Sequence, residues 1–214
     1  ELELDPSTTR SWVLIHTDDC DAYGQDLKVL NEINDAMNNE WKTELVDREI
    51  ILGVKRTLVT DSPQGWYCTL TMSAFIADLA SNFSEPLARR FGNRRVRTPF
   101  PEHRILTKAD KPREGEVERN IQLGYQRLVG SLLWIVRHVA PIAVYGMSQL
   151  CKLMATPTDD AWDCALHLLK YLHQNKERGI RFSECDYDPL GFVDASNRYD
   201  PYDGLCQYSF ALFC

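Results

Sequence analysis

The first fifth of the chain changes from a β-prone composition to helical spacing. Residues 11–17 (SWVLIHT) form a short β-prone run that ends in the acidic turn 18–21 (DDCD). This run predicts a buried strand whose end brings carboxylates to the surface. From Asp26 onward, apolar residues recur every three or four positions and therefore share one helical face. They are Leu27, Leu30, Ile33 and Met37. The pattern predicts a helix that lies on a sheet.

Two more β-prone runs flank a strong turn signal. Residues 49–59 (EIILGVKRTLV) are rich in β-branched side chains, and residues 66–70 (WYCTL) follow the turn 61–65 (DSPQG). Together they predict a hairpin of two strands. Residues 71–82 then predict a helix, because apolar side chains recur at helix-face intervals behind a Thr/Ser start.

Helical spacing dominates the second half. Residues 125–154 carry apolar side chains on one side and are interrupted at Pro141, which predicts two helices. Residues 156–160 (TPTDD) predict a helix start, and an apolar stripe follows and ends at Gly179. The stripe consists of Trp162, Ala165, Leu166, Leu169 and Leu172. Residues 190–194 and 205–213 predict two final strands.

A basic segment separates these regions. It contains Arg89, Arg90, Arg94, Arg95 and Arg97, and it runs into Thr98-Pro99. The prolines predict an extended or irregular backbone there. Two interpretations stay open for the arginines: contacts to the phosphates of a nucleic acid, or a solvated connector. Residues 108–120 are charged and contain Pro and Gly, which predicts a linker.

Composition narrows the possible classes of protein. The net charge of −7 argues against a chain that coats nucleic acid over its whole surface, although a local basic patch is compatible with it. None of the seven cysteines forms a CxxC pair or a zinc-like cluster. The longest apolar stretch, residues 132–144, is shorter than the roughly 20 residues that span a bilayer. No signal-peptide pattern opens the sequence. We expect an intracellular piece of a longer protein, without a membrane span.

Aromatic and imidazole side chains give weaker signals. His103, His138, His167 and His173 lack the spacing of metal ligands, so ordinary surface or core histidines are expected. The tryptophans fall on apolar faces, which favours packing over base stacking. They are Trp12, Trp41, Trp66, Trp134 and Trp162.

The adjacent carboxylates Asp18 and Asp19 are the clearest chemical signal. Two carboxylates at a strand end can hold magnesium, and phosphoryl transfer uses two such ions to stabilise the attacking and leaving oxygens. The alternative is that the pair only solvates a chain reversal. The pair does not decide between these alternatives by itself.

Several motifs occur in a characteristic order. The sequence reads HTDD at 16–19, ILGV at 51–54, RFG at 90–92, TP at 98–99, YQRLVGSLLW at 125–134, PT at 157–158 before Trp162, LLKYL at 168–172, GI at 179–180 and LGFVDA at 190–195. From residue 11 to the end, this order resembles the second half of a copia-type (Ty/copia) retrotransposon reverse transcriptase followed by the start of its ribonuclease H.

The resemblance implies an α+β fold in four parts. Residues 1–65 correspond to the C-terminal part of the reverse-transcriptase palm, and residues 66–120 to a thumb-like hairpin and helix with a basic linker. Residues 121–182 correspond to a helical connection region. Residues 183–214 correspond to the first strands of a truncated ribonuclease H-like sheet.

The resemblance also implies roles for individual residues. Asp18 and Asp19 would be the catalytic, magnesium-binding pair of the polymerase, and Asp194 would be a metal ligand of the ribonuclease H site. In the full-length parent, the cofactor would be Mg²⁺ and the partners an RNA or DNA template–primer and deoxynucleotides. The first palm carboxylate is expected before residue 1, and the other ribonuclease H carboxylates after Cys214. Residues 20–23 (CDAY) depart from the family's aliphatic strand, so a poor hairpin arm is expected there.

Three functional hypotheses follow. The favoured one is a fragment of an RNA-directed DNA polymerase, inactive alone, whose parent performs two-metal nucleotidyl transfer in cytoplasmic virus-like particles or the nucleus. The second is a non-catalytic nucleic-acid or protein interaction remnant of a decayed element. The third is an unrelated magnesium-dependent α+β enzyme that shares only the Asp pair.

Overall fold

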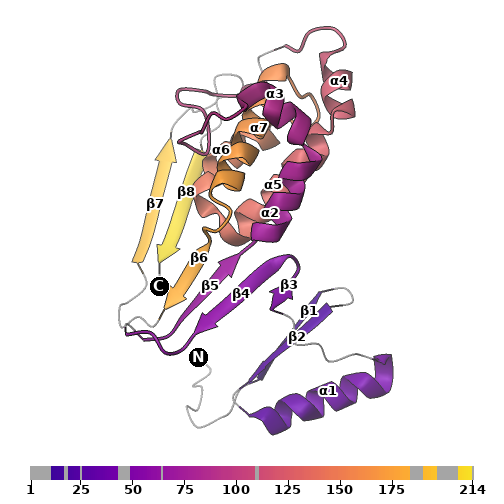
Figure 1. Cartoon of the computed structure of the whole chain (residues 1–214), viewed down its shortest axis with the longest axis vertical. Coiled ribbons are helices and arrows are strands. Elements are labelled where there is room, and N and C mark those ends of the chain that lie inside the picture. Colours follow the sequence, from indigo (N-terminus) through magenta and orange to yellow (C-terminus); the bar gives the residue numbers. More distant parts are fainter. Residues whose placement is uncertain are drawn as a thin grey trace. The chain divides into compact units, whose positions relative to one another are not determined.

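The computed structural model describes residues 11–16, 19–24, 26–42, 49–63, 65–108, 111–183, 190–196 and 207–213. Helices mix with antiparallel strands, in agreement with an α+β class (Figure 1). The chain forms two compact units, residues 1–51 and 52–214. The palm and ribonuclease H assignments, and the predicted four-part division, stay predictions.

The first unit contains a hairpin and a helix. Strand β1 (Ser11–His16) pairs antiparallel with β2 (Asp19–Gly24), from Ser11↔Gly24 to His16↔Asp19. The expectation of a poor arm at residues 20–23 is therefore wrong, because a ladder is formed by backbone groups and tolerates polar side chains. Helix α1 (Leu27–Trp41) confirms the predicted helix.

A second set of strands begins with β3 (Ile50–Ile51), which leads into β4 (Val54–Val59). The single strand predicted over 49–59 is wrong, because Leu52 and Gly53 take φ values of 52° and 80° and turn the chain. Strand β5 (Tyr67–Thr71) pairs antiparallel with β4, as predicted, and also with β6 (Ile180–Ser183). The helices of this unit therefore lie, in chain order, between two strands that pair with each other.

The described residues of the second unit include these helices: α2 (Ser73–Asn82), α3 (Ser84–Phe91), α4 (Glu116–Gln122), α5 (Tyr125–Val139), the short 3₁₀ helix η1 (Pro141–Ala143), α6 (Val144–Cys151) and α7 (Asp159–Gln174). The helix predicted at 71–82, the break at Pro141 and the helix start at Asp159 are confirmed. The linker predicted at 108–120 is wrong at its end, because α4 begins there.

Helix α7 ends earlier than the sequence predicts. It stops at Gln174, and Gly179 instead begins the approach to β6. A Cβ atom on Gly179 would lie 1.8 Å from the Leu70 carbonyl oxygen of β5. Glycine is therefore required at this position for close approach of two backbones rather than for ending a helix.

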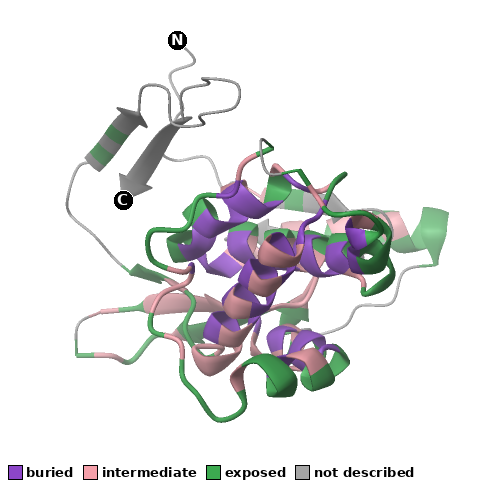
Figure 2. Cartoon of the chain, turned by 90° about the horizontal axis from the view of Figure 1, so that it is seen from above, coloured by how far each residue is buried: buried purple, intermediate pink, exposed green. Residues whose placement is uncertain are grey.

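The core of the second unit forms between α2, α5, α6 and α7 (Figure 2). Leu128, Leu132 and Ile135 of α5 and Leu168 and Leu169 of α7 are all 0% exposed. The predicted apolar stripe of α7 faces this core. Most of the free energy of folding of this unit comes from removing these side chains from water.

Buried polar groups join α4 to the start of α7. Glu116, 6% exposed, accepts the N–H of Arg113 at 2.5 Å and the N–H of Asp159 at 2.5 Å. Asn120, 0% exposed, donates to the Pro157 carbonyl at 3.2 Å. Thr158 caps α7 by accepting from Ala161 N–H at 3.2 Å. The bonds from the N–H groups of Asp159 and Ala161 satisfy donors that the start of α7 leaves unpaired, and the bond from Asn120 satisfies the Pro157 carbonyl.

Two predictions about side-chain packing of tryptophan are wrong. Trp41, at the end of α1, is 71% exposed, and Trp66, before β5, is 43% exposed. Trp162 is 8% exposed and meets the Phe83 ring edge-on at 6.0 Å, so packing is confirmed for it. The side chain of Trp12 lies outside the described residues.

The last two strands form a hairpin of their own, as predicted. Strand β7 (Leu190–Ser196) pairs antiparallel with β8 (Gln207–Phe213), from Leu190↔Phe213 to Ser196↔Gln207. Among the described residues, none of the helices has the length and apolar character needed to cross a bilayer.

Adjacent leucines of α5 test the location of the core. Leu132 is 0% exposed and Leu133 is 38% exposed. We expect Leu132→Ala to lower the free energy of unfolding by about 2–5 kcal/mol, through lost burial and a cavity, and Leu133→Ala by less than about 1 kcal/mol. Urea unfolding of both variants measures the difference, and equal losses would contradict this core.

Candidate nucleic-acid interface

The predicted arginine cluster lies at the end of α3 and in the segment 92–98. Arg89 and Arg90 occupy the last turn of α3, and the irregular backbone predicted where the segment approaches Thr98-Pro99 follows this helix. Gly92 ends the helix with φ 51° and donates its N–H to the Ala88 carbonyl at 2.8 Å. The other three arginines follow in the non-helical segment. All five arginine side chains of the cluster are exposed.

One face of α7 holds this segment. Half-buried polar residues recur every three or four positions along the helix and therefore share a face, opposite the buried apolar stripe. We call this set the polar stripe of α7: Asp160, Asp163, His167, Lys170 and Gln174. The stripe was not recognised in the sequence, although its spacing complements that of the apolar residues.

The polar stripe binds backbone groups of segment 92–98 at three points. The bonds run from Lys170 Nζ to the Gly92 carbonyl (3.3 Å), from the Val96 N–H to Gln174 Oε1 (3.1 Å), and between His167 Nε2 and the Thr98 carbonyl (2.9 Å). The Phe91 ring meets the His167 ring edge-on at 6.0 Å. The segment is therefore fixed to α7 at its beginning, middle and end.

Ion pairs extend the same attachment. Arg90 pairs with Asp163 at 2.8 Å, and Arg104 pairs with Asp160. Arg119 of α4 pairs with the neighbouring Asp159. These side chains are partly exposed, so water and salt weaken the attraction within each pair. Arg90 is thus engaged in holding α3 against α7.

The remaining arginines face solvent. Arg94 Nη2 donates to the Arg90 carbonyl at 3.0 Å. Within the described part of the chain, no carboxylate or carbonyl pairs with Arg89, Arg95 or Arg97. We call these three residues the arginine strip. Guanidinium groups that are not neutralised by a carboxylate can bind the oxygens of a phosphate through two parallel hydrogen bonds.

A second surface, missed by the sequence analysis, lies on the outer face of α5. Gly130 sits in the middle of this helix, is exposed, and has nothing within 4 Å of the position of a Cβ atom. Glycine in a helix interior costs about 1 kcal/mol relative to alanine. An isolated glycine in a helical pattern is the signal that could have located this surface.

Residues around Gly130 are held in place. Trp134 Nε1 donates to the Leu52 carbonyl at 3.3 Å, and Gln126 Nε2 donates to the Met154 carbonyl at 3.1 Å. The Arg127 guanidinium lies 5.1 Å from the centre of the Phe83 ring. These neighbours share a helical stripe with Gly130. The face therefore combines a fixed aromatic, amide and cationic border with a centre that permits close approach.

Of the three predicted metal ligands, the structure describes only Asp19 and Asp194, and of these only the backbone. The pair His16↔Asp19 closes the β1–β2 hairpin, and Asp18 lies outside the described residues, as does the side chain of Asp19. Asp194 lies in β7 opposite Ser209, with its side chain also outside them. Over the ranges that the structure describes, no three His, Cys, Asp or Glu side chains gather as a metal site. The three predicted metal-ligand roles stay predictions.

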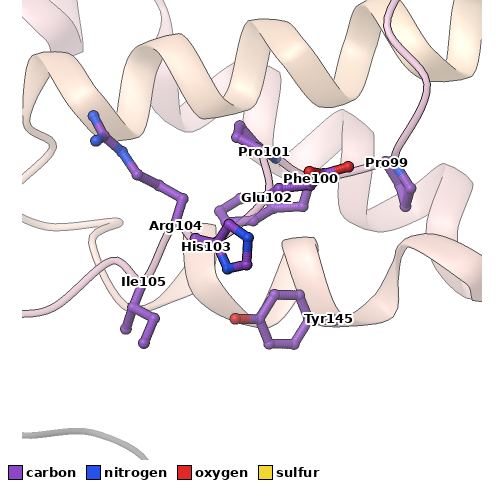
Figure 3. Close-up of a pocket in the computed structure, with 8 residues that line it drawn as sticks. All are labelled: Pro99, Phe100, Pro101, Glu102, His103, Arg104, Ile105 and Tyr145. Atoms are coloured by element: carbon purple, nitrogen blue, oxygen red, sulfur yellow. The ribbon is translucent and has the colours of Figure 1, made fainter.

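A shallow hollow of about 490 Å³ lies between residues 99–105 and the start of α6. In Figure 3, His103 and Tyr145 lie next to one another, and the Arg104 side chain extends away from both. Arg104 is already paired with Asp160. The lining is mainly apolar, and it brings no nucleophile and base together, so we assign no chemistry to this hollow.

Burial shifts the acid–base equilibria of two histidines on α7. Burial lowers the pKa of His167, with a smaller lowering from Arg90, while the hydrogen bond to Thr98 acts in the opposite direction. Burial and the cations Lys176 and Lys170 lower the pKa of His173. Both imidazoles therefore resist protonation in the folded state.

Comparison with known proteins gives one similarity. The chain is 26% identical over 170 residues to a retrovirus-related Pol polyprotein from transposon RE2 of Arabidopsis thaliana. The match covers 79% of this chain but only 11% of that protein, so the chain spans a small part of its relative. No family model matches the sequence, and no solved structure matches the fold.

Protonation of His167 should destabilise the protein. An unfolded histidine titrates near pH 6.5, and because the folded pKa is lower, the unfolded state takes up a proton that the folded state refuses. The free energy of unfolding should therefore fall as the pH drops below about 6.5. His167→Gln should reduce this fall between pH 7.5 and 5.5, measured by urea unfolding.

His103→Gln is the matched control for the pH series, because His103 is exposed and lies beside Tyr145 of α6. Its pH dependence should equal that of the unsubstituted chain. If His167→Gln shows the full fall in stability, burial of His167 does not cause the acid sensitivity.

Proposed function

We propose that this chain is a segment of a retrotransposon Pol polyprotein, taken from the reverse-transcriptase and ribonuclease H part of a copia-type element. The observation that carries the proposal is the similarity to a Pol polyprotein along four fifths of the chain. The motif order from residue 16 to residue 195 supports the finer assignment. The activity that we propose is RNA-directed DNA synthesis by the longer parent protein.

In this proposal, Asp18 and Asp19 belong to the polymerase site. The β1–β2 ladder supports this role, because Asp19 lies in the last backbone pair of the hairpin, His16↔Asp19, and Asp18 precedes it in the sequence. Carboxylate oxygens are the ligands that Mg²⁺ prefers, and the bound ion supplies charge stabilisation for nucleotidyl transfer. Asp194 of β7 has the equivalent role in the ribonuclease H part.

The second unit would contact the template–primer. Its arginine strip offers guanidinium groups to phosphates. The outer face of α5 offers Gly130 at a position where a nucleic-acid backbone can approach closely, between the side chains of Arg127 and Arg137. Together these features fit a duplex bound through its backbone rather than through its base sequence.

A non-catalytic nucleic-acid-binding segment is the second candidate. The arginine strip and the Gly130 face favour it, because both lie on α3, α5 and the segment 92–98 and do not involve the aspartates. The two candidates differ in what Asp18 and Asp19 contribute. Substitution of the aspartates separates them, since binding and synthesis are measured independently.

Gly130→Leu tests the α5 face. The new side chain has open space, and leucine favours helix over glycine, so the free energy of unfolding should stay equal or rise by up to about 1 kcal/mol. The same side chain would hold a duplex away from the helix. We expect the Kd for an RNA–DNA hybrid to rise about tenfold, a loss of about 1.4 kcal/mol.

Ala36→Leu, on the exposed face of α1, is the control because it adds a leucine to a surface that the proposal does not use. Fluorescence anisotropy with a labelled hybrid measures the Kd values. Unchanged binding by Gly130→Leu would remove the α5 face from the interface.

Primer extension tests the polymerase assignment. A version of the chain extended N-terminally through the upstream part of its reading frame should extend a primer in the presence of Mg²⁺. Asp18→Asn and Asp19→Asn should each lower the rate at least about 100-fold, because a neutral amide holds the cation poorly.

Asp35→Asn, an exposed carboxylate on α1, is the matched control and should leave primer extension unchanged. Full primer extension by the Asp18→Asn and Asp19→Asn variants would refute their catalytic role. Hybrid binding that persists without primer extension in any version would favour the non-catalytic candidate.

A further inference from the structure

Three polar side chains of α7 attach segment 92–98 to this helix. Gln174, Lys170 and His167 all bond backbone groups of the segment rather than other side chains. Two of the three are neutral at pH 7 and are only half-buried. Their common effect is to fix the path of the backbone between α3 and residue 98.

Exposure alternates along the fixed segment. Val96 is partly buried and packs against the core, whereas Arg95 and Arg97 on either side of it are exposed. The Val96 N–H is the group that Gln174 holds. Fixing Val96 by its backbone and its side chain therefore keeps both neighbouring guanidinium groups on the solvent side.

We propose that His167, Lys170 and Gln174 are positioning residues that hold segment 92–98, and with it Arg95 and Arg97 of the arginine strip, in the conformation that binds a phosphodiester backbone. This inference rests on the proposed function and adds an element to it. A strip whose backbone is fixed before binding loses less conformational freedom when the phosphates arrive. Lys170 also brings a cation to the start of segment 92–98, at the Gly92 carbonyl.

Positioning and charge have different signatures in a salt titration. Each cation that contacts a phosphate adds about 0.9 to the slope of log Kd against log salt concentration. Removing Arg95 or Arg97 should therefore lower the slope. Removing Gln174 or the hydrogen bond of His167 changes no charge at pH 7.5, so it should weaken binding at every salt concentration and leave the slope unchanged.

The experiment uses the full chain and a short labelled RNA–DNA hybrid. Gln174→Met removes the acceptor of the Val96 N–H with little change in volume, and His167→Leu removes the bond to Thr98. We expect each variant to raise the Kd about three- to tenfold at every salt concentration with an unchanged slope. His167→Gln keeps an N–H that can reach the Thr98 carbonyl, and it should restore the Kd of the unsubstituted chain.

A second measurement needs no nucleic acid. Trypsin cleaves after arginine only where the backbone can leave the fold. At a temperature well below unfolding, cleavage after Arg94, Arg95 and Arg97 should be faster in Gln174→Met and His167→Leu than in the unsubstituted chain. His167→Gln should again restore protection.

The outcomes separate this inference from the function on which it rests. If Arg95→Ala and Arg97→Ala weaken binding but Gln174→Met and His167→Leu bind and resist trypsin like the unsubstituted chain, the positioning role is overturned and the interface stands. If the unsubstituted chain shows no salt-dependent binding, or the arginine variants bind equally well, the proposed interface fails. If the proposed interface fails in this way, faster trypsin cleavage of Gln174→Met and His167→Leu shows only a structural attachment, and the positioning role is overturned too.

Discussion

Burial of the apolar side of α7 is the interaction on which the second unit depends. This helix packs against α2, α5 and α6, and residues such as Leu168 and Leu169 are completely removed from water. That burial fixes the rotation of α7 about its axis. The orientation of the opposite, polar side of the helix is therefore fixed as well. The polar stripe therefore lies along segment 92–98, and the exposed arginines follow from the packing of the core.

The start of α7 shows how this position is maintained. Glu116 accepts backbone N–H groups from both sides of the α4–α7 junction, and a buried carboxylate with two N–H donors is well compensated. Arg119 keeps the pKa of Asp159 below its usual range through a hydrogen bond. The exposed ion pairs add little free energy, but they select which segments meet the helix. Specific attachment and bulk stability thus have separate sources.

These features connect the fold to the proposed role in nucleic-acid binding. Two members of the arginine strip, Arg95 and Arg97, lie in a segment without regular secondary structure, where a flexible backbone would weaken binding to a rigid duplex. Helix α7 supplies the rigidity that the segment lacks. The Gly130 face differs in kind, because its rigid helix already fixes the position of each side chain, and an absent side chain creates the space.

The sequence by itself determined the elements whose signals are local. Apolar spacing gave α1, α5 and α7, Pro141 gave the break after α5, and the turn at 61–65 gave the β4–β5 hairpin. It also singled out the arginines and the Asp pair by residue type. The order of the motifs along the chain predicted a retrotransposon polyprotein, and the similarity to a Pol polyprotein agrees with that prediction.

Only the tertiary structure decided which of those residues are already paired or buried and which are free to bind a partner. Arg90 is engaged by Asp163 and Arg95 is not, although the sequence treats them alike. Glu116 and Asn120 looked like linker residues, yet they are buried because their partners lie about forty residues later, at Pro157 and Asp159. Gly179 serves the approach of β6 to β5 rather than a helix end. Partners distant in sequence decide each case, and residue type alone does not specify them.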